Sequence, residues 1–270
     1  MLKQRVITAA ILIPIVIALI YYLPPPAFCI LTGLVTLGAA WEWTNLMEVK
    51  NIGMRLLYIF IMGWILFAML FIPTGFVFLV AFVLWVAATM MVAFYPRGSQ
   101  WWAKSVFWRG VMGIFVLVPC WAALNYIRNQ ESGFYALLFL FALIWGADIG
   151  AYFAGKKWGK HKLAPLVSPG KSVEGFAAAM LVTFIIAILA AWWTALPVRV
   201  WPGCILIALV TVAFSVIGDL FESMLKRQAG LKDSGKLLPG HGGLLDRIDS
   251  LTAAAPIFVF TAWLLSNYVG

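Results

Sequence analysis

Charged residues concentrate in one short stretch near the end of a chain that is otherwise strongly apolar. The segment "KDSGKLLPGHGGLLDRIDS", residues 232–250, carries three aspartates, two lysines, an arginine and a histidine among four glycines, whereas the whole chain is 64% hydrophobic and 11% charged. Carboxylate oxygens are the ligands that hard divalent cations prefer. Glycine-rich backbone can also bring bare N–H groups close to an anion. The stretch therefore holds the residue types needed to handle phosphates together with a metal ion.

Most of the acids in the chain lie in its second half, near the ends of apolar segments. Seven of the ten follow residue 147, namely Asp148, Glu174, Asp219, Glu222, Asp233, Asp246 and Asp249. A charged residue at mid-membrane costs about 2.5–3.5 kcal/mol, so such residues usually face a polar cavity or a partner. An ion pair that only holds helices together would explain one such acid, but it explains the whole group poorly.

Helical periodicity places several of these polar residues on shared faces. Four of them follow the spacing i, i+4, i+7, i+11 and form one stripe: Ser215, Asp219, Glu222 and Lys226. Asp246 and Asp249 are three positions apart and also share a face. Because the last two helices are antiparallel neighbours, we expect Asp219 to lie near Asp246 and Asp249. Mg²⁺ is usually held by one or two carboxylates plus substrate phosphate oxygens, so these three aspartates are candidate ligands.

The preceding polar loop, "HKLAPLVSPGKSVEG", carries a Gly-Lys-Ser sequence at residues 170–172. It is not a Walker P-loop, because the first glycine of that motif would fall on Pro165. It still places Lys171 and Ser172 at the start of the next helix, where N–H groups attract phosphate. A loop that is basic only for membrane topology is a comparable explanation for Lys156–Lys162, but a poorer one for Lys171.

Apolar runs of helical length separate these polar segments, and the mean hydropathy is +0.99. A membrane-spanning helix needs about 17–25 apolar residues, and it satisfies its own backbone groups in lipid. Nine runs qualify: 6–23, 27–46, 55–72, 75–95, 108–127, 134–154, 174–193, 202–225 and 249–268. The runs are too long for barrel strands. We predict an all-α polytopic integral membrane protein with a single membrane-embedded domain, 1–270. Residues 1–127 form its scaffold, and residues 128–270 form its active site with two polar loops.

Basic residues predict the orientation of this protein in the membrane. All lysines and arginines except Arg128 and Arg199 fall on the side of the membrane that holds the N-terminus. The positive-inside tendency assigns that side to the cytoplasm. We therefore expect the N-terminus inside, the C-terminus outside and the active site on the cytoplasmic face. The net charge of +9 is explained by this topology, so no nucleic-acid partner is predicted.

The last polar segment resembles the signature of the CDP-diacylglycerol synthases, the phosphatidate cytidylyltransferases. Residues 223–249, "SMLKRQAGLKDSGKLLPGHGGLLDRID", carry its Ser-x-hydrophobic-Lys-Arg start, its Lys-Asp pair, its His-Gly-Gly and its Asp-Arg-x-Asp end. Residues 145–175 look like the second polar block of the family, and "AAWEW" at 39–43 extends a weaker likeness toward the N-terminus. The resemblance covers essentially the whole chain and is greatest to the bacterial, inner-membrane type.

The resemblance implies a reaction in which CTP and phosphatidate give CDP-diacylglycerol and pyrophosphate, with Mg²⁺ as cofactor. Nucleotidyl transfer joins two anions, so a metal ion and Lys or Arg clamps are its natural catalysts. Whether a monovalent cation joins the metal site is left open. The expected partners are CTP, phosphatidate and membrane lipids, with a homodimer as the assembly and the bacterial cytoplasmic (inner) membrane as the location.

The resemblance and the spacing together give each polar residue an expected role. The expected metal ligands are Asp219, Asp246 and Asp249. The expected catalytic groups are Lys226, Arg227, Arg247, Asp249 and His241, and a structural role is a comparable explanation for His241. The expected substrate-binding residues are Lys171, Ser172, Lys232, Asp233, Gly242, Gly243, Asp148 and Glu174, of which the last two orient the basic clamps.

Three other functions fit parts of the same sequence. A CTP-dependent polyprenol or phytol kinase would need similar sites but would transfer a phosphoryl group. A secondary transporter would use Asp148 and Asp219 as ion sites, but the acids gather at one membrane face and no inverted repeat is present. A non-catalytic scaffold would not need the polar residues at all.

Overall fold

Long apolar helices make up most of the protein. The computed structural model describes residues 13–235, 237 and 242–269. In this part of the chain eight helices are long and apolar enough to cross a membrane: α2 (Pro25–Leu46), α3 (Ile52–Met69), α4 (Thr74–Phe94), α5 (Val106–Arg128), α6 (Gly133–Trp158), α7 (Val173–Trp193), α8 (Trp201–Gln228) and α9 (Leu245–Val269). Two 3₁₀ turns lie between helices, η1 (Ser99–Trp101) and η2 (Val198–Val200). The predicted all-α, polytopic membrane architecture is confirmed.

The structure changes the bounds of several predicted spans. Of the span predicted at 6–23, the described part is a shorter helix, Ile13–Tyr22, and residues 6–12 lie outside the described residues. Helix α2 begins at Pro25, earlier than predicted, because proline fits the first turn of a helix. Helices α6 and α8 run past their predicted ends at 154 and 225, and each ends in a basic turn. Cations there interact favourably with the negative end of the helix dipole.

A two-stranded antiparallel hairpin, which the sequence patterns did not predict, joins α6 to α7. It consists of β1 (Lys162–Ala164) and β2 (Ser168–Ser172). Both strands are too short to show the alternation that marks a strand in sequence. Ser172 then caps α7, since its Oγ accepts a hydrogen bond from the Gly175 N–H at 3.1 Å. The hairpin and this cap together fix the position of the preceding Lys171.

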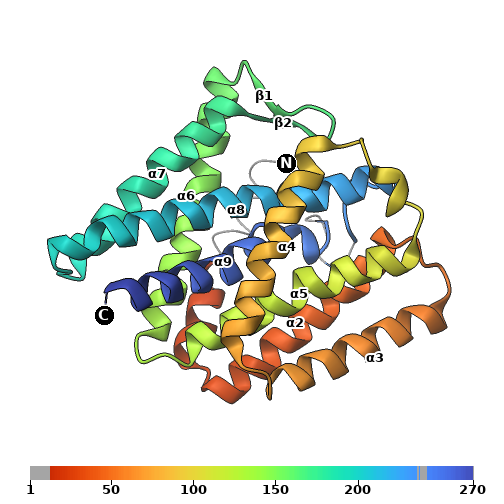
Figure 1. Ribbon diagram of the computed structural model, residues 1–270, viewed down its shortest axis with the longest axis horizontal. Helices are drawn as coiled ribbons and strands as arrows, with labels where there is room; N and C mark the ends of the chain where they lie inside the picture. Colours follow the sequence, from red (N-terminus) through yellow and green to blue (C-terminus); the bar gives the residue numbers. More distant parts are fainter. Residues whose placement is uncertain (1–12, 236, 238–241, 270) are drawn as a thin grey trace.

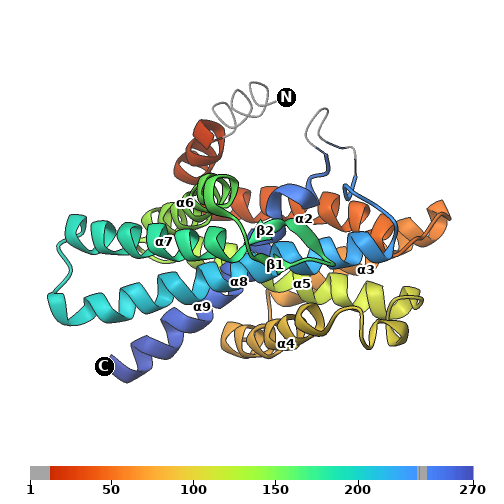
Figure 2. The same ribbon diagram turned by 90° about the horizontal axis from the view of Figure 1, so that it is seen from above.

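The helices are arranged around α8 and α9 (Figure 1). In this view α7 lies on one side of the pair and α2, α3 and α5 lie on the other, whereas α6 crosses both α8 and α9. Helix α9 contacts α2, α4, α5, α6 and α8, and β2 contacts α8, beside which the hairpin is seen in Figure 2. Segments from both ends of the chain therefore meet around the beginning of α9.

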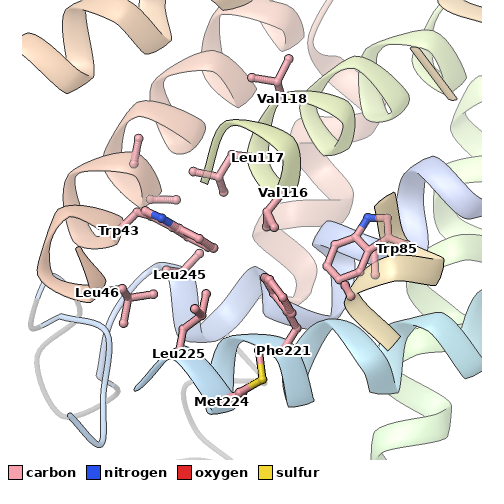
Figure 3. Packing of buried hydrophobic residues seen from close by; sticks show 14 of the residues in the cluster. Trp43, Leu46, Trp85, Val116, Leu117, Val118, Phe221, Met224, Leu225 and Leu245 are labelled. Carbon is pink, nitrogen blue, oxygen red and sulfur yellow. The ribbon is translucent and has the colours of Figure 1, made fainter. Parts of the chain in front are cut away.

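An apolar core supports this meeting point from within. Trp43 of α2, Phe221 and Leu225 of α8 and Leu245 of α9 pack together in it (Figure 3). Trp43 is fully buried and its Nε1 donates a hydrogen bond to the backbone carbonyl of Arg109 at 2.8 Å. Leu225 and Leu245 are each followed by a charged residue, so the core fixes the backbone from which these polar side chains project.

Candidate active site

Seven charged side chains gather where one end of α6, α7, α8 and α9 meets the hairpin. We call them the polar cluster; it consists of Asp148, Lys171, Asp219, Glu222, Lys226, Asp246 and Asp249. Two short ion pairs are its main contacts. Lys171 Nζ lies 2.7 Å from Asp219 Oδ2, and Lys226 Nζ lies 2.7 Å from Asp246 Oδ1. Each pair joins two different elements, so the cluster connects β2 to α8 and α8 to α9.

The predicted stripe on α8 is directed into the protein. Ser215, Glu222 and Lys226 are 2%, 3% and 9% exposed. Asp249 interacts electrostatically with both Asp219 and Glu222. The structure thus brings Asp219 and Asp249 into one electrostatic environment, as expected from the antiparallel arrangement of the last two helices.

Asp148 joins the same group from α6. It interacts electrostatically with Lys171 and with Asp219. It therefore adjoins the ion pair between β2 and α8, where a residue expected to orient a basic clamp would lie.

Carboxyl groups outnumber ammonium groups within the polar cluster, five to two. Neither carboxylate oxygen of Glu222 has a hydrogen-bond partner among the described residues, although Lys226 Nζ makes an ion-pair contact 3.2 Å from Glu222 Oε1. A buried carboxylate needs a nearby positive charge. The excess of carboxylate oxygens therefore suits an additional divalent cation.

The three predicted metal ligands do not form a ready-made coordination shell. Over residues 13–235, 237 and 242–269, no group of three His, Cys, Asp or Glu side chains has a metal-binding arrangement. Asp219 is paired with Lys171, and Asp246 is paired with Lys226. Asp249 Oδ1 accepts a hydrogen bond from the Ser250 N–H at 2.6 Å. In this structure Lys171 and Lys226 therefore lie beside the carboxylates to which a metal ion would also bind.

Asp246 also organises the chain segment that precedes α9. Its Oδ2 accepts hydrogen bonds from Gly243 N–H at 2.8 Å and from Ser234 N–H at 3.0 Å. Gly242 has a φ of 80°, which favours glycine, and a Cβ there would lie 3.0 Å from the same oxygen. Both glycines predicted to bind substrate thus allow the loop to fold tightly around Asp246.

Two residues of α2 reach the same loop, and the sequence patterns did not single them out. Glu42 is 1% exposed and accepts hydrogen bonds from Leu245 N–H at 2.9 Å, Ser234 Oγ at 3.2 Å and Leu237 N–H at 3.4 Å. Asn45 Nδ2 donates to the Ser234 carbonyl at 2.8 Å. The only signal in the sequence was an acid inside an apolar span, within the "AAWEW" segment at 39–43.

Other predicted site residues hold the surroundings of the polar cluster. Glu174 accepts hydrogen bonds from the N–H groups of Lys160 and His161 and lies 2.7 Å from His161 Nδ1, so it fastens the turn before β1. Arg227 Nε donates to the Val167 carbonyl at 3.3 Å, between the two strands. His241, predicted to contact phosphate, lies outside the described residues.

A cavity of about 960 Å³ lies between the α2–α3 connection and residues 229–235, and Ser234 in its wall donates a backbone hydrogen bond to Asp246 of the polar cluster. Its lining includes Lys50, Lys232 and Asp233, and also Arg55, whose guanidinium lies 4.3 Å from the centre of the Trp41 ring. Ligand sites have volumes of about 300–1,000 Å³, so a nucleotide would fit. Lys232 and Asp233, both predicted to bind substrate, thus lie in the wall of a cavity of suitable size. Arg247, which was predicted to be catalytic, does not line this cavity and is exposed at the start of α9.

Comparisons with known proteins find relatives that match nearly the whole chain. Residues 3–265 match the model of the Cytidylyltransferase family. The chain is 41% identical over 266 residues to a phosphatidate cytidylyltransferase of Pseudomonas aeruginosa, covering 97% of both chains. It is 38% identical over 282 residues to a phosphatidate cytidylyltransferase of Haemophilus influenzae, covering 96% of this chain and 98% of the relative. For a protein of that name from Brucella suis biovar 1 the identity is 34%, covering 95% and 91%.

Proposed function

The chain belongs to the cytidylyltransferase family, and we infer that it transfers the cytidylyl group of CTP to phosphatidate. The products are CDP-diacylglycerol and pyrophosphate. The single observation that carries this function is the match of nearly the whole chain to phosphatidate cytidylyltransferases. The polar cluster, and a nucleotide-sized cavity linked to it through Ser234 and Asp246, are consistent with this function.

In this reaction an oxygen of the phosphatidate phosphate forms a bond to the α-phosphorus of CTP. The bond between the α-phosphorus and the oxygen that bridges to the β-phosphate breaks, and that oxygen leaves with pyrophosphate. No side-chain nucleophile is needed, because the lipid phosphate is the nucleophile. The barrier is largely electrostatic, since two anions must approach each other. We therefore assign the phosphate-binding role to the cations of the site: Lys171, Lys226, Arg227, Lys232 and Arg247.

Mg²⁺ is part of the same proposal, with Asp219, Asp246 and Asp249 as its protein ligands. The excess of carboxyl groups over ammonium groups in the polar cluster supports it. When bound, the ion would offset phosphate charge as a Lewis acid. Asp219 and Asp246 also hold Lys171 and Lys226 within 2.7 Å, so the carboxylates keep these ammonium groups in position for an incoming phosphate.

The location of the polar cluster suits a lipid substrate. Phosphatidate keeps its acyl chains in the bilayer, so its phosphate stays at headgroup depth. The polar cluster lies at the ends of membrane-spanning helices, beside residues that leave the apolar zone. We propose that this end faces the cytoplasm of a bacterial cell, in the inner membrane, and that the protein acts as a homodimer.

Reporter fusions test the proposed orientation. Near Lys160, a reporter enzyme that is active only in the cytoplasm should show activity. After Gly270, activity should instead come from a reporter enzyme that is active only outside the cytoplasm. This orientation is expected because loops rich in Lys and Arg stay on the cytoplasmic side of the membrane. An insertion near Arg199 serves as a control and should match the Gly270 fusion. If Lys160 and Gly270 mapped to the same side, the number of spans between them would be wrong.

Labelled CTP tests the reaction itself. With phosphatidate, label in the α-phosphate should enter lipid and label in the γ-phosphate should enter pyrophosphate. A lipid kinase would instead move the γ-label into lipid, and a transporter would move neither label. A chelator should stop the transfer and added Mg²⁺ should restore it. Transfer that continues at full rate with excess chelator would contradict the metal proposal but not the cytidylyl transfer.

A further inference from the structure

One serine in the loop before α9 is held at all of its polar atoms. The Ser234 N–H donates to Asp246 Oδ2 at 3.0 Å, and its Oγ donates to Glu42 Oε2 at 3.2 Å. Its carbonyl accepts from Asn45 Nδ2 at 2.8 Å, and the residue is 1% exposed. Two of the three partners come from α2 and one from α9. Ser234 therefore connects the N-terminal part of the bundle to a predicted metal ligand.

Glu42 also contacts the first residue of α9. Its Oε2 accepts the hydrogen bond of the Leu245 N–H at 2.9 Å, at the end of the helix where N–H groups lack partners within the helix. A carboxylate at this position interacts favourably with the helix dipole. Among the described residues, the hydrogen-bond partners of the Glu42 carboxylate are N–H or O–H donors of Ser234, Leu237 and Leu245. Its charge is thus directed at the loop and at the start of α9.

Two glycines of the loop allow this close approach. A Cβ on Gly235 would overlap Glu42 Oε1, and a Cβ on Gly243 would overlap Glu42 Oε2 and Ser234 Oγ. No other residue type can make contacts this close unless the Glu42 side chain or the loop shifts. The loop is therefore shaped to surround the Glu42 carboxylate.

We propose that Glu42 and Asn45 are positioning residues for cytidylyl transfer. They hold Ser234, and through it they fix Asp246 and the 229–235 wall of the cavity. This inference rests on the proposed function. Both residues act from α2, so the N-terminal region supplies part of the active-site support and is more than a membrane scaffold. Residues that support metal ligands in this way typically contribute about ten- to a hundredfold to affinity or activity.

A cycle of single and double variants tests the proposal in the full-length protein. Gly235→Ala should lower kcat/KM for CTP by about tenfold or more, because the new Cβ collides with the Glu42 carboxylate. Glu42→Ala should lower it by about ten- to a hundredfold. In the double variant the collision is absent, so adding Gly235→Ala to Glu42→Ala should cost less than about twofold.

Gly63→Ala is the matched control, because a Cβ at Gly63 would meet no atom within 4 Å. Its effect should be the same with and without Glu42→Ala. The proposal would be overturned if the fall in kcat/KM of the double variant equalled the product of the falls in the Gly235→Ala and Glu42→Ala single variants. The two residues would then not act through one contact.

Hydrogen exchange supplies a readout that does not need activity. In Glu42→Gln the side-chain amide keeps the size of the carboxylate but can accept fewer hydrogen bonds. The backbone amides of Leu237 and Leu245 should exchange at least about tenfold faster, whereas amides in α7 should be unchanged. Unchanged exchange at Leu237 and Leu245 together with native kcat/KM would overturn the proposal. Failure of the wild-type protein to label lipid would count against the proposed function, and the exchange result would still stand.

Discussion

Replacing Asp246 by Asn should lower kcat/KM for cytidylyl transfer by about a hundred- to a thousandfold while the protein still inserts into the membrane. The Asp246 carboxylate holds Lys226 Nζ at 2.7 Å and accepts hydrogen bonds from the N–H groups of Ser234 and Gly243. An asparagine has one oxygen and an NH₂ group that cannot accept them. It is also a poor ligand for Mg²⁺. The measurement is lipid labelling from α-labelled CTP over a range of Mg²⁺ concentrations.

The exposed Glu131, in the loop between α5 and α6, provides the matched control. Glu131→Gln removes one carboxylate charge as Asp246→Asn does, and it should leave kcat/KM within about twofold of the native value. Amounts of folded protein in the membrane should be similar for both variants. Near-native activity of Asp246→Asn at ordinary Mg²⁺ would remove Asp246 from the metal site.

The membrane-spanning helices could be predicted because their signal is local. A long apolar run is sufficient evidence for a span, and the stripe on α8 follows from helical periodicity within that single element. Bounds were less accurate, as in α6 and α8, where basic turns extend the helix beyond the apolar run. The hairpin between α6 and α7 was missed because its strands are too short for a pattern.

Contacts between distant segments explain what the sequence could not reveal about the site. Glu42 and Ser234 are 192 positions apart, and no periodicity relates a helix in the N-terminal half to a glycine-rich loop. The pairing of Lys171 with Asp219 was also not derivable, although both residues were singled out. Sequence patterns identified groups that suit phosphate and metal chemistry, and only the packing of α2, α8 and α9 showed which of them touch.

Replacing Lys226 by Met should lower both the free energy of unfolding and the enzymatic activity, for two different reasons. The lysine is 9% exposed, and its ammonium group lies between Asp246, at 2.7 Å, and the buried Glu222, at 3.2 Å. Removing one partner of a buried ion pair costs about 3–5 kcal/mol, because the other charge is left uncompensated. We expect a loss of that size in the free energy of unfolding, measured in detergent micelles. Activity should fall by at least about a hundredfold, because a cation that would contact the substrate phosphates is lost.

A second substitution distinguishes the effect on stability from the effect on activity. Adding Glu222→Gln to Lys226→Met removes the uncompensated buried charge, so it should restore much of the lost stability but none of the activity. Arg199→Ala, which removes an exposed arginine of η2 just before α8, is the control for loss of a cation and should change neither quantity. Arg128 would be a poorer control, because its guanidinium donates a hydrogen bond to the Leu23 carbonyl at 2.9 Å. If the double variant recovered activity along with stability, Lys226 would be only a counterion for Glu222, and its proposed contact with phosphate would be wrong.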